Sequence, residues 1–227
     1  MAVGGDRQMT FLLAGPEKRL LVALARRMPA AVNSDHLTAI GVLGALGTGG
    51  AYYLTNWDTR WLWMATVLLV VNWFGDSLDG TVARVRKVER PRFGFYLDHA
   101  VDAFATVVII ACLGLSPLVS FEWAMLLVAG YLVLSINVYL EAQVFGQFRL
   151  SYGVLGPTEA RILLIVANTV LAIGTSSGAW SLAALRTGAD WVMGAAVALM
   201  FGLFLARFVA NVGRLYREEP LPPAGGG

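Results

Sequence analysis

Six long apolar stretches alternate with short polar connections along the chain. They lie at roughly 37–56, 61–82, 94–114, 120–145, 158–177 and 189–212. A helix needs about 20 mostly apolar residues to cross a hydrocarbon core of about 30 Å. The helices of a soluble bundle would carry a polar face at helical spacing, but stretches such as 64–72 and 192–205 are apolar all round. The pattern therefore predicts an all-α integral membrane protein with six transmembrane helices.

The segment before the first apolar stretch has a different pattern. Between residues 15 and 29, Leu20, Leu21 and Leu24 share one helical face, while the basic residues lie mostly elsewhere. This arrangement is typical of a helix that lies in the membrane interface. We therefore expect three parts: an N-terminal segment (1–36) with an interfacial amphipathic helix, a transmembrane domain (37–213), and a disordered tail (214–227) that contains PLPPAGGG.

Composition and charge support a membrane location and predict an orientation. Hydrophobic residues make up 57% of the chain and charged residues only 14%. Of the 17 lysines and arginines, all but Arg60 and Arg186 fall on one side of the predicted spans. The positive-inside rule then predicts a multi-pass protein with cytoplasmic termini and cytoplasmic loops near 83–93 and 146–157. A net charge of +2 gives no indication of a nucleic-acid partner.

Four carboxylates enter the apolar helices on the predicted cytoplasmic side. Asp76 and Asp79 end the second stretch, and Asp98 and Asp102 begin the third. Spacings of three and four place each pair on one helical face, and the short connection can bring the two faces together. Charges at membrane depth cost several kcal/mol each unless they are compensated. Mg²⁺ prefers oxygen ligands, and two such ions can clamp a phosphoryl group during its displacement, so the pattern indicates a metal site for phosphate chemistry.

Two other interpretations of the aspartates account for less of the pattern. Capping of helices, or pairing with Arg84, Arg86 and Lys87, explains one or two of the carboxylates but not all four. A proton or ion pathway also uses intramembrane acids, but the acidic cluster occurs once and the chain lacks the internal repeat that marks transporter halves. The small side chains of Gly80 and Ala83 suit the close approach of a nucleotide, although helix packing would use them equally well.

The spacing of these residues resembles the signature of the CDP-alcohol phosphotransferase family. All eight defining positions match: Asp76, Asp79, Gly80, Ala83, Arg84, Gly94, Asp98 and Asp102. The resemblance implies six transmembrane helices, a homodimer, and a cytoplasm-facing cavity that takes a CDP-activated alcohol, a lipid acceptor and two divalent cations, Mg²⁺ or Mn²⁺.

The resemblance also implies a role for each motif position. Contacts to the CDP moiety fall on Asp76, Asp79, Gly80, Ala83 and Arg84. The four aspartates Asp76, Asp79, Asp98 and Asp102 are the implied metal ligands, with Asp102 nearest the reacting centre. In this family the last aspartate is thought to help activate the acceptor hydroxyl.

Two short segments resemble the choline and ethanolamine phosphotransferases within the family. These are Asp98-His99-x-x-Asp102 and the segment 156–160, which contains Thr158 and Glu159. A neutral lipid hydroxyl, such as that of diacylglycerol, needs a base as it attacks phosphorus, and His99 and Glu159 are candidates beside Asp102. Alternatively, His99 is hydrogen-bonded at a helix start, and Glu159 interacts with a helix dipole or with Arg161.

A second substrate class stays open in the sequence. Enzymes that transfer a phosphatidyl group from CDP-diacylglycerol to a phosphorylated alcohol need a basic pocket, which Arg149, Arg161, Arg207 and Arg214 would supply. Positive-inside topology explains Arg214 without any ligand. Asn137 and Glu141, four residues apart, line a cavity or hydrogen-bond between helices.

Overall fold

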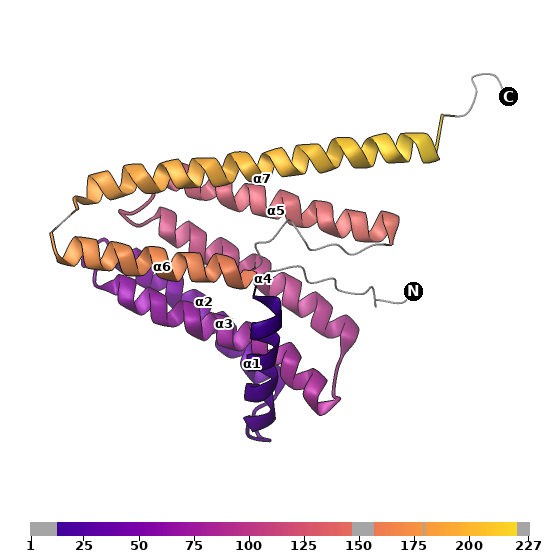
Figure 1. Cartoon of the computed structure of the whole chain (residues 1–227), viewed down its shortest axis with the longest axis horizontal. Coiled ribbons are helices and arrows are strands. Elements are labelled where there is room, and N and C mark those ends of the chain that lie inside the picture. Colours follow the sequence, from indigo (N-terminus) through magenta and orange to yellow (C-terminus); the bar gives the residue numbers. More distant parts are fainter. Residues whose placement is uncertain (1–12, 147–156, 179, 222–227) are drawn as a thin grey trace.

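The computed structural model describes residues 13–146, 157–178 and 180–221, and every regular element in these ranges is a helix (Figure 1). The elements are α1 (Ala14–Arg27), α2 (Ser34–Leu54), α3 (Trp61–Arg86), α4 (Pro91–Gly114), α5 (Phe121–Phe145), α6 (Pro157–Ser176) and α7 (Leu182–Glu218). Within the described residues, the six helices α2–α7 are long and apolar enough to cross a membrane. The predicted fold class is confirmed.

The helix ends differ from the predicted ones because a helix does not stop at the edge of its apolar stretch. Helix α3 continues to Arg86, which carries both of its aspartates inside regular helix. Helix α7 continues to Glu218, beyond residue 213, the predicted end of the transmembrane domain. Residues 222–227 of the predicted disordered tail lie outside the described residues.

Helices α2 and α3 pack backbone against backbone. A Cβ added to Gly75 would lie 2.3 Å from the Gly41 nitrogen, and one added to Gly44 would lie 2.6 Å from the Asn72 nitrogen. The buried side chain of Asn72 donates to the Gly41 carbonyl at 2.9 Å. Small residues permit this close approach between membrane helices. The contact fixes the turn of α3 that leads directly into Asp76.

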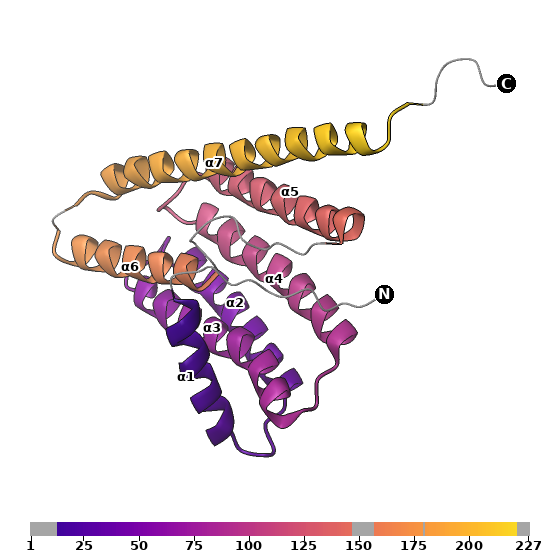
Figure 2. The same ribbon diagram turned by 45° about the vertical axis from the view of Figure 1, so that its right-hand side comes forward.

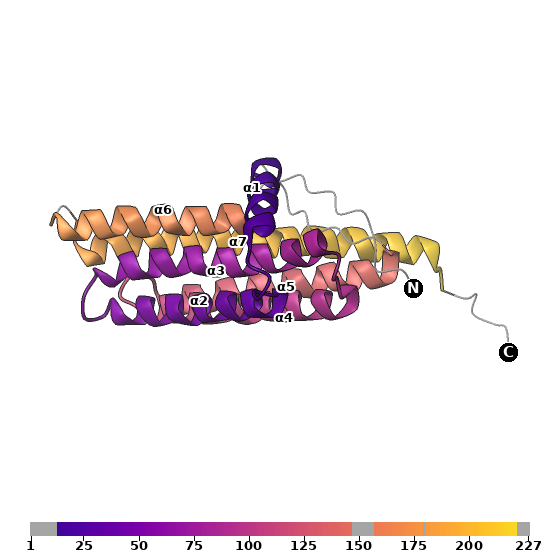
Figure 3. The same ribbon diagram turned by 90° about the horizontal axis from the view of Figure 1, so that it is seen from below.

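Helix α1 crosses the other helices at a steep angle, whereas α2–α7 run side by side (Figures 1 and 3). Its apolar face buries Leu21 and Ala25 against residues of α2 and α3, while its lysine and arginines stay exposed. Glu17 Oε1 accepts hydrogen bonds from Trp73 Nε1 at 2.9 Å and from Thr158 Oγ1 at 2.7 Å. The predicted amphipathic helix is therefore present and is tied to α3 and α6.

The remaining helices each pack against one or two neighbours. Helix α6 packs on α3, α4 packs on α2 and α5, and α7 packs on α5 (Figure 2). At one end of α5, the Ser120 nitrogen donates to Asp190 Oδ1 of α7 at 2.7 Å, which satisfies a backbone donor at the helix start. At the other end of the bundle, α3, α4 and α6 bring their charged side chains together.

Candidate active site

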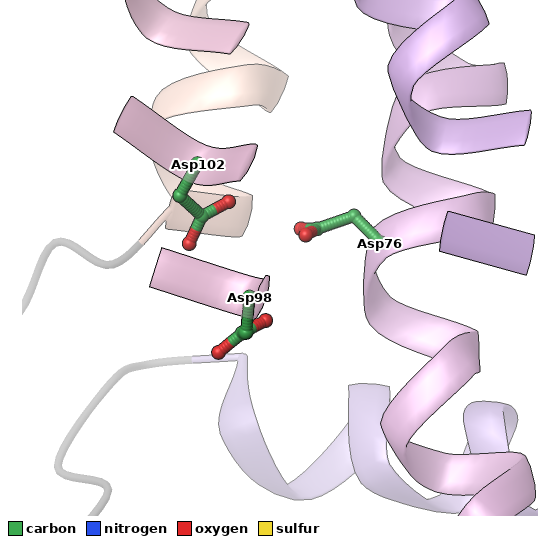
Figure 4. A group of neighbouring side chains, drawn as sticks. All are labelled: Asp76, Asp98 and Asp102. Carbon is green, nitrogen blue, oxygen red and sulfur yellow. The ribbon is translucent and has the colours of Figure 1, made fainter. Parts of the chain in front are cut away.

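Three carboxylates from two helices meet where α3 and α4 face each other. Asp76 projects from α3 toward Asp98 and Asp102 of α4 (Figure 4). One ligand oxygen from each lies within 4.8 Å of the others, and all three residues are half-buried. We call these three residues the aspartate cluster. The structure therefore brings together the two helical faces that the sequence placed opposite each other.

The short connection between α3 and α4 sets this register. Helix α3 ends at Arg86, and the left-handed backbone of the following residue, Lys87 (φ 58°), lets the Val88 nitrogen reach the Ala83 carbonyl at 3.0 Å. Helix α4 then begins at Pro91, whose fixed φ suits a first helical position. Because Asp98 and Asp102 are four residues apart, both lie on the face of α4 that the connection directs toward Asp76.

Asp79 lies beside the aspartate cluster but outside it. Its carboxylate accepts hydrogen bonds from Thr38 Oγ1 of α2 and from the Gly80 nitrogen, and its carbonyl accepts one from Ser34 Oγ at 3.0 Å. Residues three apart on a helix are rotated by about 60° from each other. That rotation turns Asp79 toward α2, so three of the four predicted ligands are gathered in one group of the described residues.

Arg161 of α6 completes the charged site. Its Nη2 donates to Asp76 Oδ2 at 2.7 Å, and the two side chains are only 15% and 18% exposed. Asp102 also lies within electrostatic reach of this guanidinium. Sequence reasoning treated Arg161 as a phosphate ligand or a partner of Glu159 and missed this pair. The sequence feature that could have revealed the pair is a lone arginine one turn into an apolar helix, in a chain whose other apolar helices carry several aspartates.

His99 turns one ring nitrogen back to its own helix. Nδ1 lies 2.7 Å from the Phe95 carbonyl and 3.6 Å from Asp98 Oδ2. A carbonyl only accepts, so Nδ1 carries the proton in this contact, and proton acceptance by a neutral ring falls to Nε2. The ring also contacts Phe95 and Tyr139, with centroids 4.2 and 5.5 Å apart. The Nδ1 contact thus lies within α4, to the carbonyl four residues earlier.

Glu159 anchors the chain at the start of α1. It is buried in the first turn of α6, and its Oε1 accepts a hydrogen bond from the Leu13 nitrogen at 3.0 Å. The neighbouring Thr158 donates to Glu17 of α1. Glu159 is not part of the aspartate cluster.

Three further motif residues, Gly80, Ala83 and Arg84, lie on the last turns of α3, and Gly94 lies in the first turn of α4. Arg84 donates from Nη2 to Thr81 Oγ1 at 3.0 Å, and a Cβ on Gly80 would lie 3.2 Å from Arg84 Nη1. Glycine at position 80 therefore leaves room for the arginine side chain, and the half-buried Ala83 follows one turn later. Arg86 donates to the carbonyls of Met28, Pro29 and Val32, which ties α3 to the end of α1 and the residues after it.

A second polar group joins α5 to α7, and we call it the glutamate network. Glu141 Oε1 accepts hydrogen bonds from Asn137 Nδ2 at 2.6 Å, Asn211 Nδ2 at 2.7 Å and Arg207 Nε at 2.9 Å, and Arg207 Nη2 donates to Oε2. The pair Asn137 and Glu141 thus serves an interhelical contact. Arg214 pairs with Glu218 at 2.7 Å, and Arg149 lies outside the described residues.

The aspartate cluster suits a hard divalent cation. Its three donors are carboxylate oxygens, the ligand type that Mg²⁺ and Mn²⁺ prefer. Ligand oxygens around an octahedral Mg²⁺ lie about 3 to 4.2 Å apart. The oxygens of the aspartate cluster, all within 4.8 Å of one another, need little or no movement to reach that spacing.

Comparisons with known proteins agree with this chemistry. A search of curated proteins found no match to the chain. A family model described as CDP-alcohol phosphatidyltransferase matches residues 33–202, a range that contains α2–α6, most of α7 and every motif residue. The members of this family are membrane transferases that act on CDP-alcohols and lipids in phospholipid synthesis. The family match, together with the aspartate cluster and the six helices that are long and apolar enough to cross a membrane, shows that the chain belongs to the CDP-alcohol phosphatidyltransferase family.

Proposed function

We propose that this protein transfers a phospho-alcohol group from CDP-choline or CDP-ethanolamine to a lipid hydroxyl such as that of diacylglycerol, with release of CMP. The observation that carries the proposal is the convergence of Asp76, Asp98 and Asp102 within the family motif. The residues from Asp98 to Asp102 favour the aminoalcohol branch, because they keep a histidine directly after the first of these two aspartates.

The reaction is an in-line displacement at the β-phosphorus of the donor. The acceptor oxygen forms a bond to this phosphorus as the bond to the bridging oxygen breaks, and CMP leaves with that electron pair. When bound, two divalent cations would neutralise the diphosphate and the leaving group. Asp76, Asp98 and Asp102 would hold them, with Asp79 as the further ligand that the motif implies.

The acceptor hydroxyl must lose its proton as it attacks. Asp102 is our first candidate to take this proton, because it lies deepest in α4 among the clustered aspartates and the motif places it nearest the reacting centre. His99 is the second candidate, through Nε2, because its Nδ1 is directed at the Phe95 carbonyl. Glu159 is bonded to the Leu13 nitrogen, so its contribution would be to position α1.

An apolar cleft beside the site supports a lipid substrate. It has a volume of about 240 Å³ and is partly open to the outside. Its lining comes from α3 and α6, namely Val70, Trp73, Thr158, Arg161, Ile162 and Ile165. Arg161 belongs to both the cleft and the charged site, so an acyl chain in the cleft would place its polar end near Asp76.

Phosphatidyl transfer from CDP-diacylglycerol to a polar or phosphorylated alcohol is the second candidate. The observation that favours it is the position of Arg161 at the edge of the aspartate cluster, where a guanidinium would suit an acceptor phosphate. The homodimer and the cytoplasmic orientation of the site and both termini remain predictions from the family and from the charge distribution.

A parallel assay of CMP release separates these activities. Purified protein with Mg²⁺ or Mn²⁺ would receive CDP-choline or CDP-ethanolamine plus diacylglycerol, or CDP-diacylglycerol plus a panel of free and phosphorylated alcohols. We expect CMP from the first mixture. CMP from the second mixture alone would replace aminoalcohol transfer with phosphatidyl transfer, and no CMP from either would contradict both proposals. Asp58→Asn, at an exposed loop aspartate whose side chain contacts Arg60 of the same loop, is a matched control for aspartate substitutions and should keep activity.

A further inference from the structure

The ion pair between Arg161 and Asp76 is unusual in its placement. It joins residues 85 positions apart on α6 and α3, at a donor–acceptor distance of 2.7 Å. Both side chains are largely shielded from solvent, so salt and water weaken the pair less than they weaken a surface pair. The carboxylate involved is also a member of the aspartate cluster.

The guanidinium and a divalent cation would therefore draw on the same carboxylate. A cation about 2.1 Å from Asp76 Oδ2, the oxygen that Arg161 contacts, would lie no more than about 5 Å from Arg161 Nη2. Two like charges so close in a site with little water repel each other strongly. Binding of the ion must then weaken the pair, and the pair must weaken binding of the ion.

From this geometry we propose that Arg161 is an internal counter-ion that competes with a divalent cation for Asp76 and so sets the affinity of the site for the metal. The inference rests on the proposed metal dependence of the function. In the absence of competing cations, Arg161 offsets part of the repulsion among the three carboxylates. When a cation takes Asp76, the guanidinium is released beside the cluster.

A positioning role for Arg161 predicts the opposite change in metal affinity when the arginine is removed. If Arg161 served to orient Asp76 for the ion, removal of the arginine would leave a loosely held ligand and would weaken metal binding. If it competes, removal of the arginine strengthens metal binding. The direction of the change in affinity therefore decides between competition and positioning.

The test is a titration of the whole purified protein with Mn²⁺ alone, with free Mn²⁺ followed by electron paramagnetic resonance. We expect Arg161→Gln to bind its tightest Mn²⁺ about tenfold or more tightly than the wild type. Arg90→Gln is the matched control, because Arg90 also pairs with an aspartate, Asp35, but at an exposed position outside the cluster. It removes the same charge and should leave Mn²⁺ affinity within about twofold of the wild type.

Equal or weaker Mn²⁺ binding by Arg161→Gln would overturn the proposal, as would an equal gain in Arg90→Gln. If Arg161→Gln does not fold, Arg161→Met decides the question, because methionine also removes the charge and its flexible apolar side chain suits the apolar lining around position 161. We expect that variant to bind Mn²⁺ more tightly than the wild type, and unchanged or weaker binding would contradict competition.

This measurement is independent of the CMP assay. Tighter Mn²⁺ binding by Arg161→Gln without CMP release by the wild type would support the counter-ion role of Arg161 and contradict the proposed function. CMP release by the wild type without a gain in Mn²⁺ affinity in Arg161→Gln would support the proposed function and contradict the counter-ion role of Arg161.

Discussion

The aspartate cluster and the glutamate network both place a carboxylate beside an arginine inside the helical bundle, but they differ in balance. Glu141 accepts four hydrogen bonds, two of them from Arg207. A carboxylate offers about four acceptor positions, so this group is close to saturated by the protein. In the aspartate cluster, three carboxylates lie within 4.8 Å of one another. The first group holds two helices together, and the second concentrates negative charge that suits a bound cation.

The largest effect should come from the aspartate cluster. Asp98→Asn or Asp102→Asn removes a ligand charge, and we expect CMP release to fall about a thousandfold or more. Removal of one of three repelling carboxylates should leave the thermal stability unchanged or raised, because functional sites are often destabilising. Activity and melting temperature measured on the same preparation check both parts, and normal turnover in either variant would exclude the proposed site.

The glutamate network should respond in the opposite way. Glu141→Gln leaves the Arg207 guanidinium without its charged partner, and we expect a loss of about 3 kcal/mol in stability. The Glu141→Gln/Arg207→Gln double variant should recover part of that loss, because it removes the uncompensated charge as well. Thermal denaturation of the single and double variants measures the coupling. Strictly additive losses would show that the pair contributes nothing as a unit.

The next largest effect is a stabilisation by added metal that depends on the aspartate cluster and not on the glutamate network. If Mn²⁺ binds the folded protein alone, a concentration one hundred times its dissociation constant raises stability by about 2.7 kcal/mol. We expect this gain in the wild type and in Glu141→Gln, and not in Asp102→Asn. A chelator should reverse the gain. Stabilisation of Asp102→Asn to the wild-type extent would place the stabilising ion elsewhere.

The sequence predicted those features that depend on neighbouring residues. Spacing alone placed Asp98 and Asp102 on one face, and the short connection brought that face to Asp76. The contacts that it missed depend on packing between distant helices. Arg161 reaches Asp76 because α6 packs on α3, and Glu159 meets Leu13 because α1 lies across the start of α6. No periodicity within a single helix contains that information.

Asp79 shows the same limit most clearly. The sequence grouped it with Asp76 because residues three apart share a face, which is correct to within about 60°. Because of that difference, the Asp79 carboxylate accepts a hydrogen bond from Thr38 of α2, 41 positions earlier. Asp79 therefore lies between the two kinds of region, with a protein partner of its own and a position beside the aspartate cluster.

The smallest expected effect tests to which region Asp79 belongs. Thr38→Val keeps the size of the side chain but removes the hydroxyl that donates to Asp79. If Thr38 orients Asp79 as a further ligand, the variant should bind Mn²⁺ up to about tenfold more weakly. Thr48→Val is the matched control, because Thr48 of the same helix donates to the Gly44 carbonyl and should not alter Mn²⁺ affinity. A loss of stability with unchanged Mn²⁺ affinity in Thr38→Val would instead assign Asp79 to helix packing, as Glu141 is.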